Sequence, residues 1–306
     1  LPARPTWHTD HIPDLSGQVI IVTGSNTGIG KVTVKELLKH NAKVYMAVRS
    51  REKAEAAIKD LKKETGKEAI FLKLDLGDLT TIKLLSRIFS SQNETHLHVL
   101  INNAGVAAPP RDMLTSQGYD LQFGVNTLGR PFRHFYFTTL LLPILTSTAQ
   151  TTPDKKVRVV HVSSYAHHFY AKLDFNSFKD GPARRRMGIW LCMDRAKRRG
   201  NILLSNELAR RYGDQGIVSI SSPGSVRSEL QRYGLAPYGV YLFYPVELGS
   251  LTPLYAATAP ECAEYNGEYL SPWARHELVS QTQVPETCSR KGIVAVHGGA
   301  SERLLM

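Results

Sequence analysis

The fold is decided by one short stretch of sequence, Thr23-Gly24-Ser25-Asn26-Thr27-Gly28-Ile29-Gly30. An apolar, β-branched run from Gln18 to Val22 precedes it and is typical of a buried strand. A segment with apolar residues on one helical face, Lys31 to His40, follows it. The glycines therefore lie on a tight strand-to-helix turn, where backbone N–H groups at the helix start face an anion. Glycine triplets also occur in plain structural turns, but this placement indicates a nucleotide site.

Each glycine of this turn has its own predicted role. Gly24 lets the chain turn sharply, Gly28 lets the backbone approach a phosphate, and Gly30 lets the helix pack against the strand.

The composition is that of a globular protein with a sizeable core. Of the 306 residues, 42% are hydrophobic and 21% are charged. The three cysteines, Cys192, Cys262 and Cys288, are far apart and form neither a disulfide framework nor a metal-binding pattern. We therefore expect a reducing compartment and no metal. No apolar run is long enough to span a bilayer and no signal-peptide pattern is present, which favours a cytoplasmic location.

The formal net charge of +11 is partly local. Seven basic residues fall between Arg184 and Arg199, against the single acid Asp194. No nucleic-acid motif accompanies them, so we expect a solvated basic loop and no nucleic-acid partner. The same charge also favours an anionic cofactor.

Alternation of strands and helices along the chain predicts a parallel sheet with helices on both faces. Ligands in such sheets bind beyond the carboxyl ends of the strands. Residues 1–16 are expected to form an extended lead-in, residues 17–275 the nucleotide-binding domain, and residues 276–306 a weakly ordered tail. After the first strand and helix, the predicted segments are strands at Lys43–Val48, Ala69–Leu74 and Leu97–Ile101, and helices at Ser50–Thr65 and Leu79–Ser90.

The end of the second strand bears on the choice of cofactor. An acid at this place would bind the ribose 2′-hydroxyl of NAD, but the sequence reads Ala47-Val48-Arg49-Ser50-Arg51. Arg49 is suited to bind a 2′-phosphate bidentately. We therefore expect NADP(H), with NAD(H) as the alternative cofactor and a surface arginine as the alternative role.

At this point the sequence resembles the short-chain dehydrogenase/reductase family, from about Asp14 to about Arg275. Several motifs in the family's order carry the resemblance: Thr23 to Gly30, Asp75-Leu76, Asn102-Asn103-Ala104-Gly105, Val125-Asn126, Ser163-Ser164 and Pro223-Gly224. The chain is most similar to the retinol-dehydrogenase-like branch and its fungal relatives. This narrower likeness rests on Ser163 to His168 and Asn201 to Ala209.

The resemblance implies an α/β fold, a single Rossmann-type doubly wound domain with about seven parallel strands. It implies that Asn103, with Ala104 and Gly105, lies against the cofactor ribose, and that Asp75 and Leu76 border the adenine. By the same resemblance, Pro223 and Gly224 border the nicotinamide. In the family's reaction, Ser164 would polarise the substrate carbonyl, Asn126 would anchor a water of the proton relay, and Lys197 would lower the pKa of a catalytic tyrosine.

That tyrosine is where the sequence departs from the family. The Tyr-xxx-Lys pattern should precede Gly200-Asn201, but the chain reads Met193-Asp194-Arg195-Ala196-Lys197-Arg198-Arg199. Pairing with Lys197 places Met193 at the tyrosine position, and pairing with Arg198 places Asp194 there. Neither residue offers a phenol, and the unperturbed pKa of an aspartate is several units lower than that of tyrosine. Either the chain is a naturally inactivated relative, or its gene model is imperfect here.

Other unusual segments have simpler interpretations. Arg130-Pro131-Phe132-Arg133 is predicted to be a short insertion that breaks a helix. His161, His167 and His168 lack an acid or cysteine at metal-ligand spacing, and Ser164 lacks the Gly-x-Ser-x-Gly elbow of a hydrolase. The aromatic stretch from Tyr238 to Pro245 fits a lid over a lipophilic substrate, a membrane-surface patch, or a segment packed on the core.

Two functional hypotheses follow. The first is an NADP(H)-dependent oxidoreductase that acts on a small-molecule carbonyl or alcohol, with a lipophilic substrate. The second is a nucleotide-binding protein without redox turnover that acts through a partner. Peripheral membrane contact and homo-oligomerisation are compatible with both.

Overall fold

The computed structural model describes residues 4–91, 94–106, 109–110, 112–116, 118–121, 125, 133–163, 180–182, 184, 197–222 and 244–276. A compact unit extends from Leu1 to His276, and residues 277–306 form a separate unit that lies outside the described ranges. The predicted domain boundaries at residues 16 and 275 stay predictions.

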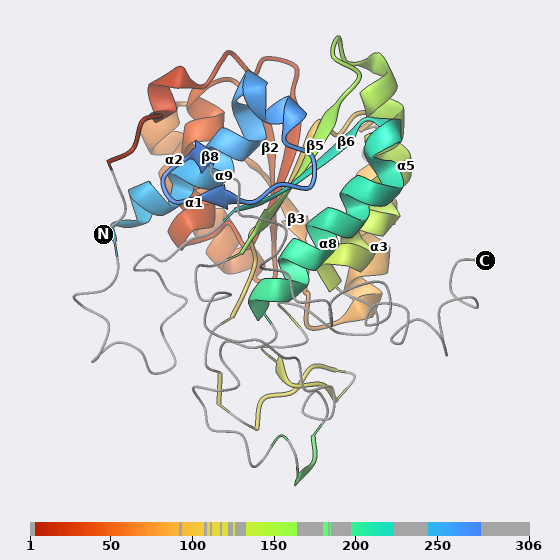
Figure 1. Cartoon of the computed structure of the whole chain (residues 1–306). Helices are drawn as coiled ribbons and strands as arrows, with labels where there is room; N and C mark the ends of the chain where they lie inside the picture. The colour runs from red at the N-terminus through yellow and green to blue at the C-terminus, as the bar shows by residue number, and fades with distance from the viewer. Residues whose placement is uncertain are drawn as a thin grey trace. The chain divides into compact units, whose positions relative to one another are not determined.

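A parallel sheet forms the centre of the described part (Figure 1). Its strand order is β3-β2-β1-β4-β5-β6, so β1 lies in the interior of the sheet, between β2 and β4. The strands are β1 (Val19–Thr23), β2 (Lys43–Val48), β3 (Ile70–Lys73), β4 (Val99–Asn102), β5 (Val157–Val162) and β6 (Ile217–Ser222). Their backbone N–H and C=O groups pair in register, for example Thr23 with Ala47 and Ile101 with Val160.

Helices cover both faces of this sheet, which confirms the doubly wound α/β prediction (Figure 1). One face carries α1 (Gly28–Lys39), α2 (Arg51–Thr65) and α9 (Val246–Thr258). The other carries α3 (Leu79–Ser91), α5 (Arg133–Thr151) and α8 (Lys197–Tyr212). Because both faces are buried, β1 is apolar at almost every position and each of its five side chains is buried.

The family resemblance implies about seven parallel strands, and the described residues contain six. The short strand β7 (Leu270–Ser271) lies next to β6, where a seventh strand would extend the sheet. It pairs instead, antiparallel, with β8 (Arg275–His276). The described residues also include three short 3₁₀ helices: η1 (Thr9–His11), η4 (Gly213–Gln215) and η6 (Pro260–Glu264).

Local signals set the ends of α2. The Ser50 side chain accepts a hydrogen bond from the Lys53 N–H (3.3 Å), and the helix ends at Gly66, as the sequence predicts.

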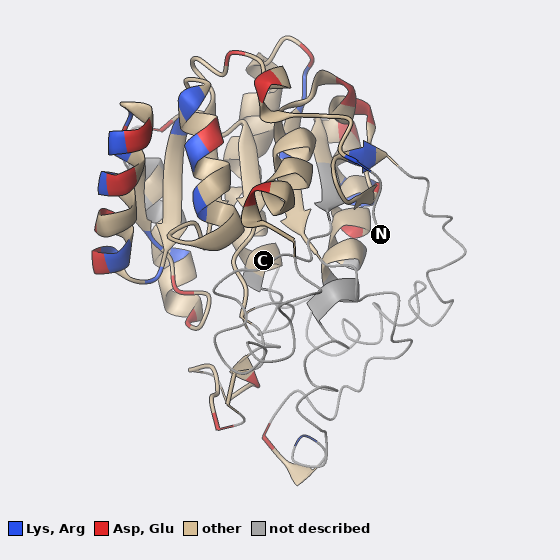
Figure 2. Cartoon of the chain, turned by 90° about the vertical axis from the view of Figure 1, so that its left-hand side faces the viewer, with Lys and Arg blue, Asp and Glu red and all other residues tan. Residues whose placement is uncertain are grey.

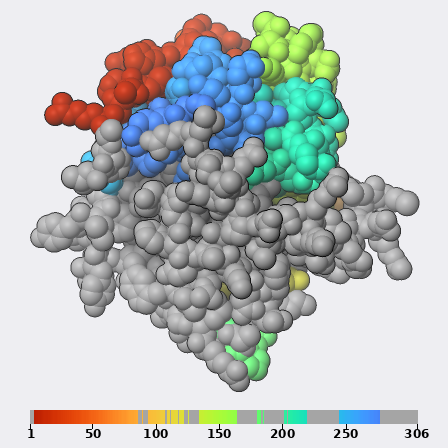
Figure 3. Space-filling model, viewed as in Figure 1, coloured from red at the N-terminus to blue at the C-terminus, as the bar shows by residue number. Residues whose placement is uncertain are grey.

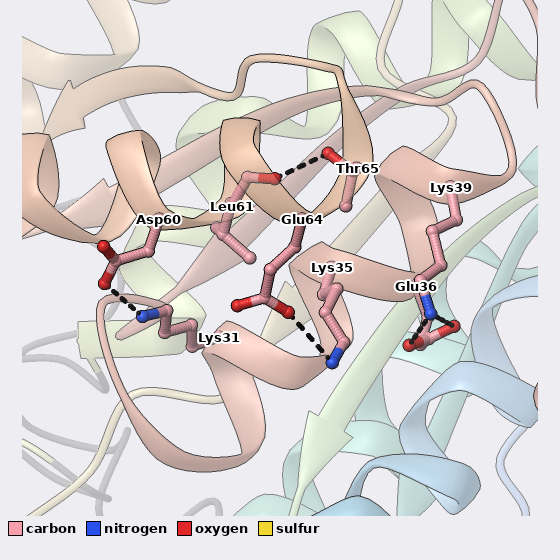
Figure 4. Close-up of polar contacts among 8 residues, drawn as sticks. All are labelled: Lys31, Lys35, Glu36, Lys39, Asp60, Leu61, Glu64 and Thr65. Atoms are coloured by element: carbon pink, nitrogen blue, oxygen red, sulfur yellow. Dashed lines mark hydrogen bonds and ion pairs between the residues drawn. The ribbon is translucent and has the colours of Figure 1, made fainter.

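The exposed faces of α1 and α2 mix basic and acidic residues (Figure 2). Two ion pairs, Lys31–Asp60 and Lys35–Glu64, join these helices across their exposed sides (Figure 4).

The segment before β1 is packed more closely than an extended lead-in. The Trp7 ring meets the Tyr255 ring of α9 edge-on, with 5.5 Å between centroids. Ile12 and Leu15 are also buried against the same side of the sheet.

Among the described residues, no helix combines the length and the apolar character needed to cross a membrane.

Candidate functional site

The carboxyl ends of β1 and β4 are held together by the Thr23 hydroxyl and the Asn103 amide. Thr23 Oγ1 accepts hydrogen bonds from the N–H groups of Asn103 (3.0 Å) and Ala104 (2.9 Å), and it donates to Ile101 O (3.4 Å). In return, Asn103 Nδ2 donates to Thr23 O (2.9 Å) and Gly24 O (3.2 Å). The two strand ends, about eighty residues apart in sequence, thus form one rigid edge.

Two glycines of the turn, Gly24 and Gly30, lie where no side chain fits. A Cβ at Gly24 would come within 2.7 Å of Ala104 Cα, and the backbone there has a φ of +63°. A Cβ at Gly30 would come within 2.6 Å of the Asn103 amide nitrogen and 2.7 Å of Gly24 O. The turn, the start of α1 and the end of β4 therefore approach each other through backbone alone.

The first turn of α1 has N–H groups available for an anion. The helix begins at Gly28, its N-cap Thr27 makes no side-chain capping bond, and the first turn contains no acid. Before it, the Ser25 hydroxyl turns inward and donates to Val22 O (2.9 Å). Asn26 and Ile29 are partly buried on the same turn. This arrangement suits a phosphate group at the helix N-terminus.

Basic side chains follow the neighbouring strands β2 and β3. Gly24 N–H donates to Ala47 O (2.9 Å), so the end of β2 lies beside the glycine turn. Arg49 follows β2, is exposed, and has no side-chain partner among the described residues. Lys73 Nζ donates to Arg49 O (2.6 Å), and the Arg51 guanidinium lies 4.5 Å from the centroid of the Phe71 ring. The sequence-predicted place for a 2′-phosphate is thus cationic and open.

The residues predicted to border the adenine and the ribose follow β3 and β4. Asp75 Oδ1 accepts from Gly77 N–H (2.6 Å), and Leu76 is buried in the core of the α3 face. Ala104 and Gly105 are partly exposed beyond β4. All of these residues lie at the carboxyl edge of the sheet, on the side of the glycine turn.

A layer of buried polar side chains lies beneath this edge. Asn102 Nδ2 donates to Thr138 Oγ1 of α5 (3.1 Å) and lies 3.4 Å from His161 Nδ1 of β5. His134 Nε2 lies 3.4 Å from Thr23 Oγ1. Burial, with His134 nearby, lowers the pKa of His161 to about 3, so its ring is neutral at physiological pH. Asn102 Oδ1 and His161 Nε2 have no hydrogen-bond partner among the described residues.

Helix α8 begins next to the end of β5. Its buried residue Asn201 donates from Nδ2 to Val162 O (3.1 Å), at the end of the strand that leads into Ser163 and Ser164. Lys197, the predicted catalytic lysine, is the first residue of α8 and lies one turn before Asn201. The structure thus brings the start of α8 to the carboxyl end of β5.

Several predicted site residues lie outside the described residues: Ser164, Asn126, Pro223, Gly224, Met193 and Asp194. The same holds for His167, His168 and most of the aromatic stretch from Tyr238 onward. At its end, the Tyr244 ring packs edge-on against Trp273, with 4.9 Å between centroids. For that residue, packing on the core is the observed arrangement.

The structure corrects one prediction about the basic segment. Arg184, expected in a solvated loop, is 5% exposed and binds Asp120 Oδ2 through both Nε (3.1 Å) and Nη2 (3.0 Å). Its charge is buried because a carboxylate compensates it. Among the described residues, no group of His, Cys, Asp and Glu side chains could hold a metal ion.

Sequence reasoning missed His134, Asn201 and the role of His161. His134 and His161 lie on the apolar elements α5 and β5, where the only signal was a polar residue among apolar ones. Asn201 lies on α8, which is rich in polar residues, so nothing in the sequence marks it as the one that binds β5.

The comparisons with known proteins agree with this geometry. A family model described as short chain dehydrogenase matches residues 18–172. A short-chain dehydrogenase/reductase of Armillaria gallica is 52% identical over 90% of this chain and 87% of its own length. Human retinol dehydrogenase 11 is 35% identical over 91% of this chain and 88% of its own. A solved structure of an uncharacterised Mycobacterium paratuberculosis protein has a TM-score of 0.69 and 27% identity, covering 95% of this chain and 94% of that one.

A hydroxyl deletion tests the Thr23 contact. Thr23→Val should lower the free energy of unfolding by about 2 kcal/mol or more, because two backbone N–H groups lose their acceptor. It should also weaken nicotinamide nucleotide binding, since the edge that carries Asn103 and Gly24 loosens. Urea unfolding and calorimetric titration measure both effects.

Thr33→Val is the matched control for this experiment. Thr33 is equally buried, but its hydroxyl has no partner among the described residues. Its removal should leave stability unchanged or slightly raised. Equal losses in the two variants would contradict the proposed importance of the Thr23 bonds.

The neutral, buried His161 predicts an acid-labile fold. Its pKa of about 3 in the folded state lies below its ordinary value of 6.5, so the unfolded chain takes up the proton first. Stability should therefore fall as the pH drops below about 6.5, by at most about 1.4 kcal/mol per pH unit from this residue. In urea unfolding between pH 7.5 and 5.5, His161→Asn should flatten the dependence, whereas His11→Asn, at an exposed site, should not. Parallel pH dependences in wild type and His161→Asn would exclude this source.

Proposed function

Because the chain belongs to the short-chain dehydrogenase/reductase family, we propose that it is an NADP(H)-dependent oxidoreductase of a lipophilic carbonyl or alcohol. The family, its oxidoreductase class and the retinol-dehydrogenase-like branch follow from the matches to relatives over most of the chain. The preference for NADP(H), the substrate class and the fate of the catalytic tyrosine belong to the proposal.

The observation that carries the cofactor choice is Arg49. Its guanidinium is exposed, has no partner among the described residues, and follows the strand beside the glycine turn. A planar guanidinium binds a phosphate bidentately, which a ribose hydroxyl does not require. Lys73, whose ammonium binds Arg49 O, adds a second positive charge. These features support binding of a 2′-phosphate.

The residues present fit a dinucleotide. The turn excludes a Cβ at Gly24 and Gly30, and the start of α1 offers N–H groups that no side chain caps. In this proposal the turn residues Thr23, Gly24, Ser25, Asn26, Gly28, Ile29 and Gly30 hold the pyrophosphate. Asp75 and Leu76 border the adenine, Asn103, Ala104 and Gly105 the ribose, and Pro223 and Gly224 the nicotinamide. When bound, the reduced nicotinamide supplies a hydride to the substrate carbonyl carbon.

The protein must then deliver a proton to the carbonyl oxygen. We assign Ser164 as the hydrogen-bond donor that polarises this oxygen and Asn126 as the anchor of a water in the proton relay. Lys197 would favour an ionised phenol, since an adjacent cation lowers the pKa of a tyrosine. The bond from Asn201 to Val162 O supports this grouping, because it holds the start of α8 against the strand that leads to Ser164.

One observation favours a second function. The position four residues before Lys197 is Met193, which transfers no proton. In that case the protein binds the nucleotide without redox turnover and acts through a partner. Cofactor binding is common to both functions, so only turnover distinguishes them.

The substrate class is proposed from the relatives. Retinol, for which human retinol dehydrogenase 11 is named, is a lipophilic alcohol. A lipophilic substrate would make contact with a membrane surface useful to the enzyme. The cytoplasmic location, the peripheral membrane contact and the homo-oligomer stay predictions.

The role of Arg49 is tested by reversing its charge. Arg49→Asp should lower the ratio of NADPH to NADH affinity at least tenfold, because a carboxylate repels a 2′-phosphate and accepts from a 2′-hydroxyl. Calorimetric titration with each cofactor measures the ratio. Arg210→Asp, on the exposed face of α8, is the control for charge alone and should leave the ratio unchanged. Equal affinities for the two cofactors in the wild type would remove Arg49 from the site.

Turnover is tested by restoring a tyrosine. We expect slow NADPH oxidation by the wild type with aliphatic aldehydes and retinoids, and a gain with Met193→Tyr of up to about 10²–10⁴-fold. Asp194→Tyr is the register control, because it is spaced for Arg198, whose guanidinium differs in geometry from an ammonium. Ordinary turnover by the wild type, unchanged in both variants, would show that the proton comes from another group.

A further inference from the structure

A cavity of about 630 Å³ lies at the amino edge of the sheet, opposite the glycine turn. Its size is within the range of small-molecule sites, about 300–1,000 Å³. The walls come from the segment before β1, the starts of β4 and β5, the end of α5 and the last turn of α9. In Figure 3 the parts of the chain that hold the segment before β1, the end of α5 and α9, coloured red, yellow-green and blue, meet on the upper part of the molecule.

The cavity contains an arginine that is mostly buried and has no carboxylate partner in the part of the chain that the structure describes. Arg158 Nη1 donates to Ala256 O of α9 (3.3 Å), and this is the guanidinium's only hydrogen bond among the described residues. Burial lowers the pKa of Arg158, while Asp154 and Glu261 favour its charged form from a distance without an ion pair. Buried charges are normally paired. Arg158 therefore has several N–H donors and an unbalanced charge at the cavity.

Further donors line the same cavity. Arg158 of β5 and Lys156, which directly precedes this strand, both line the cavity. His98 Nδ1 accepts from Val19 N–H (3.0 Å), which leaves Nε2 as the protonated nitrogen of the neutral ring. His96 stacks on His98 with 5.9 Å between centroids. The cavity thus combines two cations with at least one neutral N–H donor.

The acids at the cavity are engaged or exposed. Asp154 Oδ1 accepts from Lys156 N–H (3.1 Å). Glu264 pairs with Lys156 Nζ at 2.6 Å, but its side chain is 75% exposed, so the pair is weak and open to competition. An anion entering the cavity would compete with Glu264 for Lys156 and would meet Arg158 without a competitor.

We propose that this cavity binds the phosphate group of a small organic phosphate monoester, with Arg158 as its main contact and Lys156 as the second. Two cations match a doubly charged phosphate better than a singly charged carboxylate. The volume exceeds that of a phosphate alone, and Pro13, Leu15, Val99 and Ala257 supply apolar surface for an organic body. The site lies at the opposite edge of the sheet from the nucleotide turn and is independent of it.

The test is calorimetric titration of the full chain with hexyl phosphate, at saturating NADH, which carries no phosphate monoester, so that the nucleotide site takes up no probe. The wild type should bind one equivalent. Arg158→Gln should weaken binding at least tenfold, and Lys156→Ala should weaken it less. Glu264→Gln should tighten binding, because it removes the competitor for Lys156. Lys63→Gln, on the exposed face of α2, is the charge control and should bind like the wild type.

Arg158 also donates a hydrogen bond to the end of α9, so Arg158→Gln removes a structural contact together with the proposed ligand contact. Lys156→Ala and Glu264→Gln leave that contact intact, and their opposite effects do not follow from a loss of folding. Sedimentation with vesicles containing phosphatidic acid distinguishes the phosphate sources: binding to vesicles alone, dependent on Arg158, would identify a lipid headgroup. Absence of binding to both probes, or binding that is equal in the wild type and Arg158→Gln, would overturn the proposal.

Discussion

The candidate site depends on one reciprocal contact, the Thr23 hydroxyl and the Asn103 amide. Four hydrogen bonds between these residues and their neighbours join the ends of β1 and β4. A bond of this kind contributes only about 1 kcal/mol net, but a buried donor left without an acceptor costs more. With the strand ends fixed in this way, a Cβ atom at Gly24 or Gly30 would clash with neighbouring atoms, so only glycine fits at these two positions. The direction of α1, and with it the place where its N–H groups meet an anion, follows from this closure.

The buried polar layer extends the same constraint across the sheet. From Thr23 it passes through His134 and Thr138 of α5 to Asn102 and His161, which lie on neighbouring strands. Asn201 then ties α8 to the end of β5. Polar groups in an apolar core have few alternative partners, so they restrict the structure to one arrangement. The carboxyl edges that carry the residues proposed to bind the cofactor and the strand that leads to Ser164 are therefore positioned together.

The elements with local signals could be predicted from sequence. The β-branched runs gave β2 at its observed bounds and β1 within one residue, and the Ser50 cap and Gly66 gave the ends of α2. Contacts between distant residues could not be predicted in this way. Trp7 against Tyr255, Arg184 against Asp120, and His161 beside Asn102 each depend on how the chain folds back. The family resemblance implied a seventh parallel strand. The residues beside β6 form β7 instead, which pairs antiparallel with β8 across a tight turn.

The departure from the Tyr-xxx-Lys pattern concerns chemistry more than fold. No described contact that positions the site requires a phenol: the glycine turn is held by Thr23 and Asn103, and the start of α8 by Asn201. A chain without the tyrosine would therefore keep the structure that we propose to bind the nucleotide. The cost falls on the transition state, where the charge on the carbonyl oxygen needs a proton from a group with a matched pKa. Fold and cofactor binding are thus compatible with either functional hypothesis, and the rate of hydride transfer is the quantity that separates them.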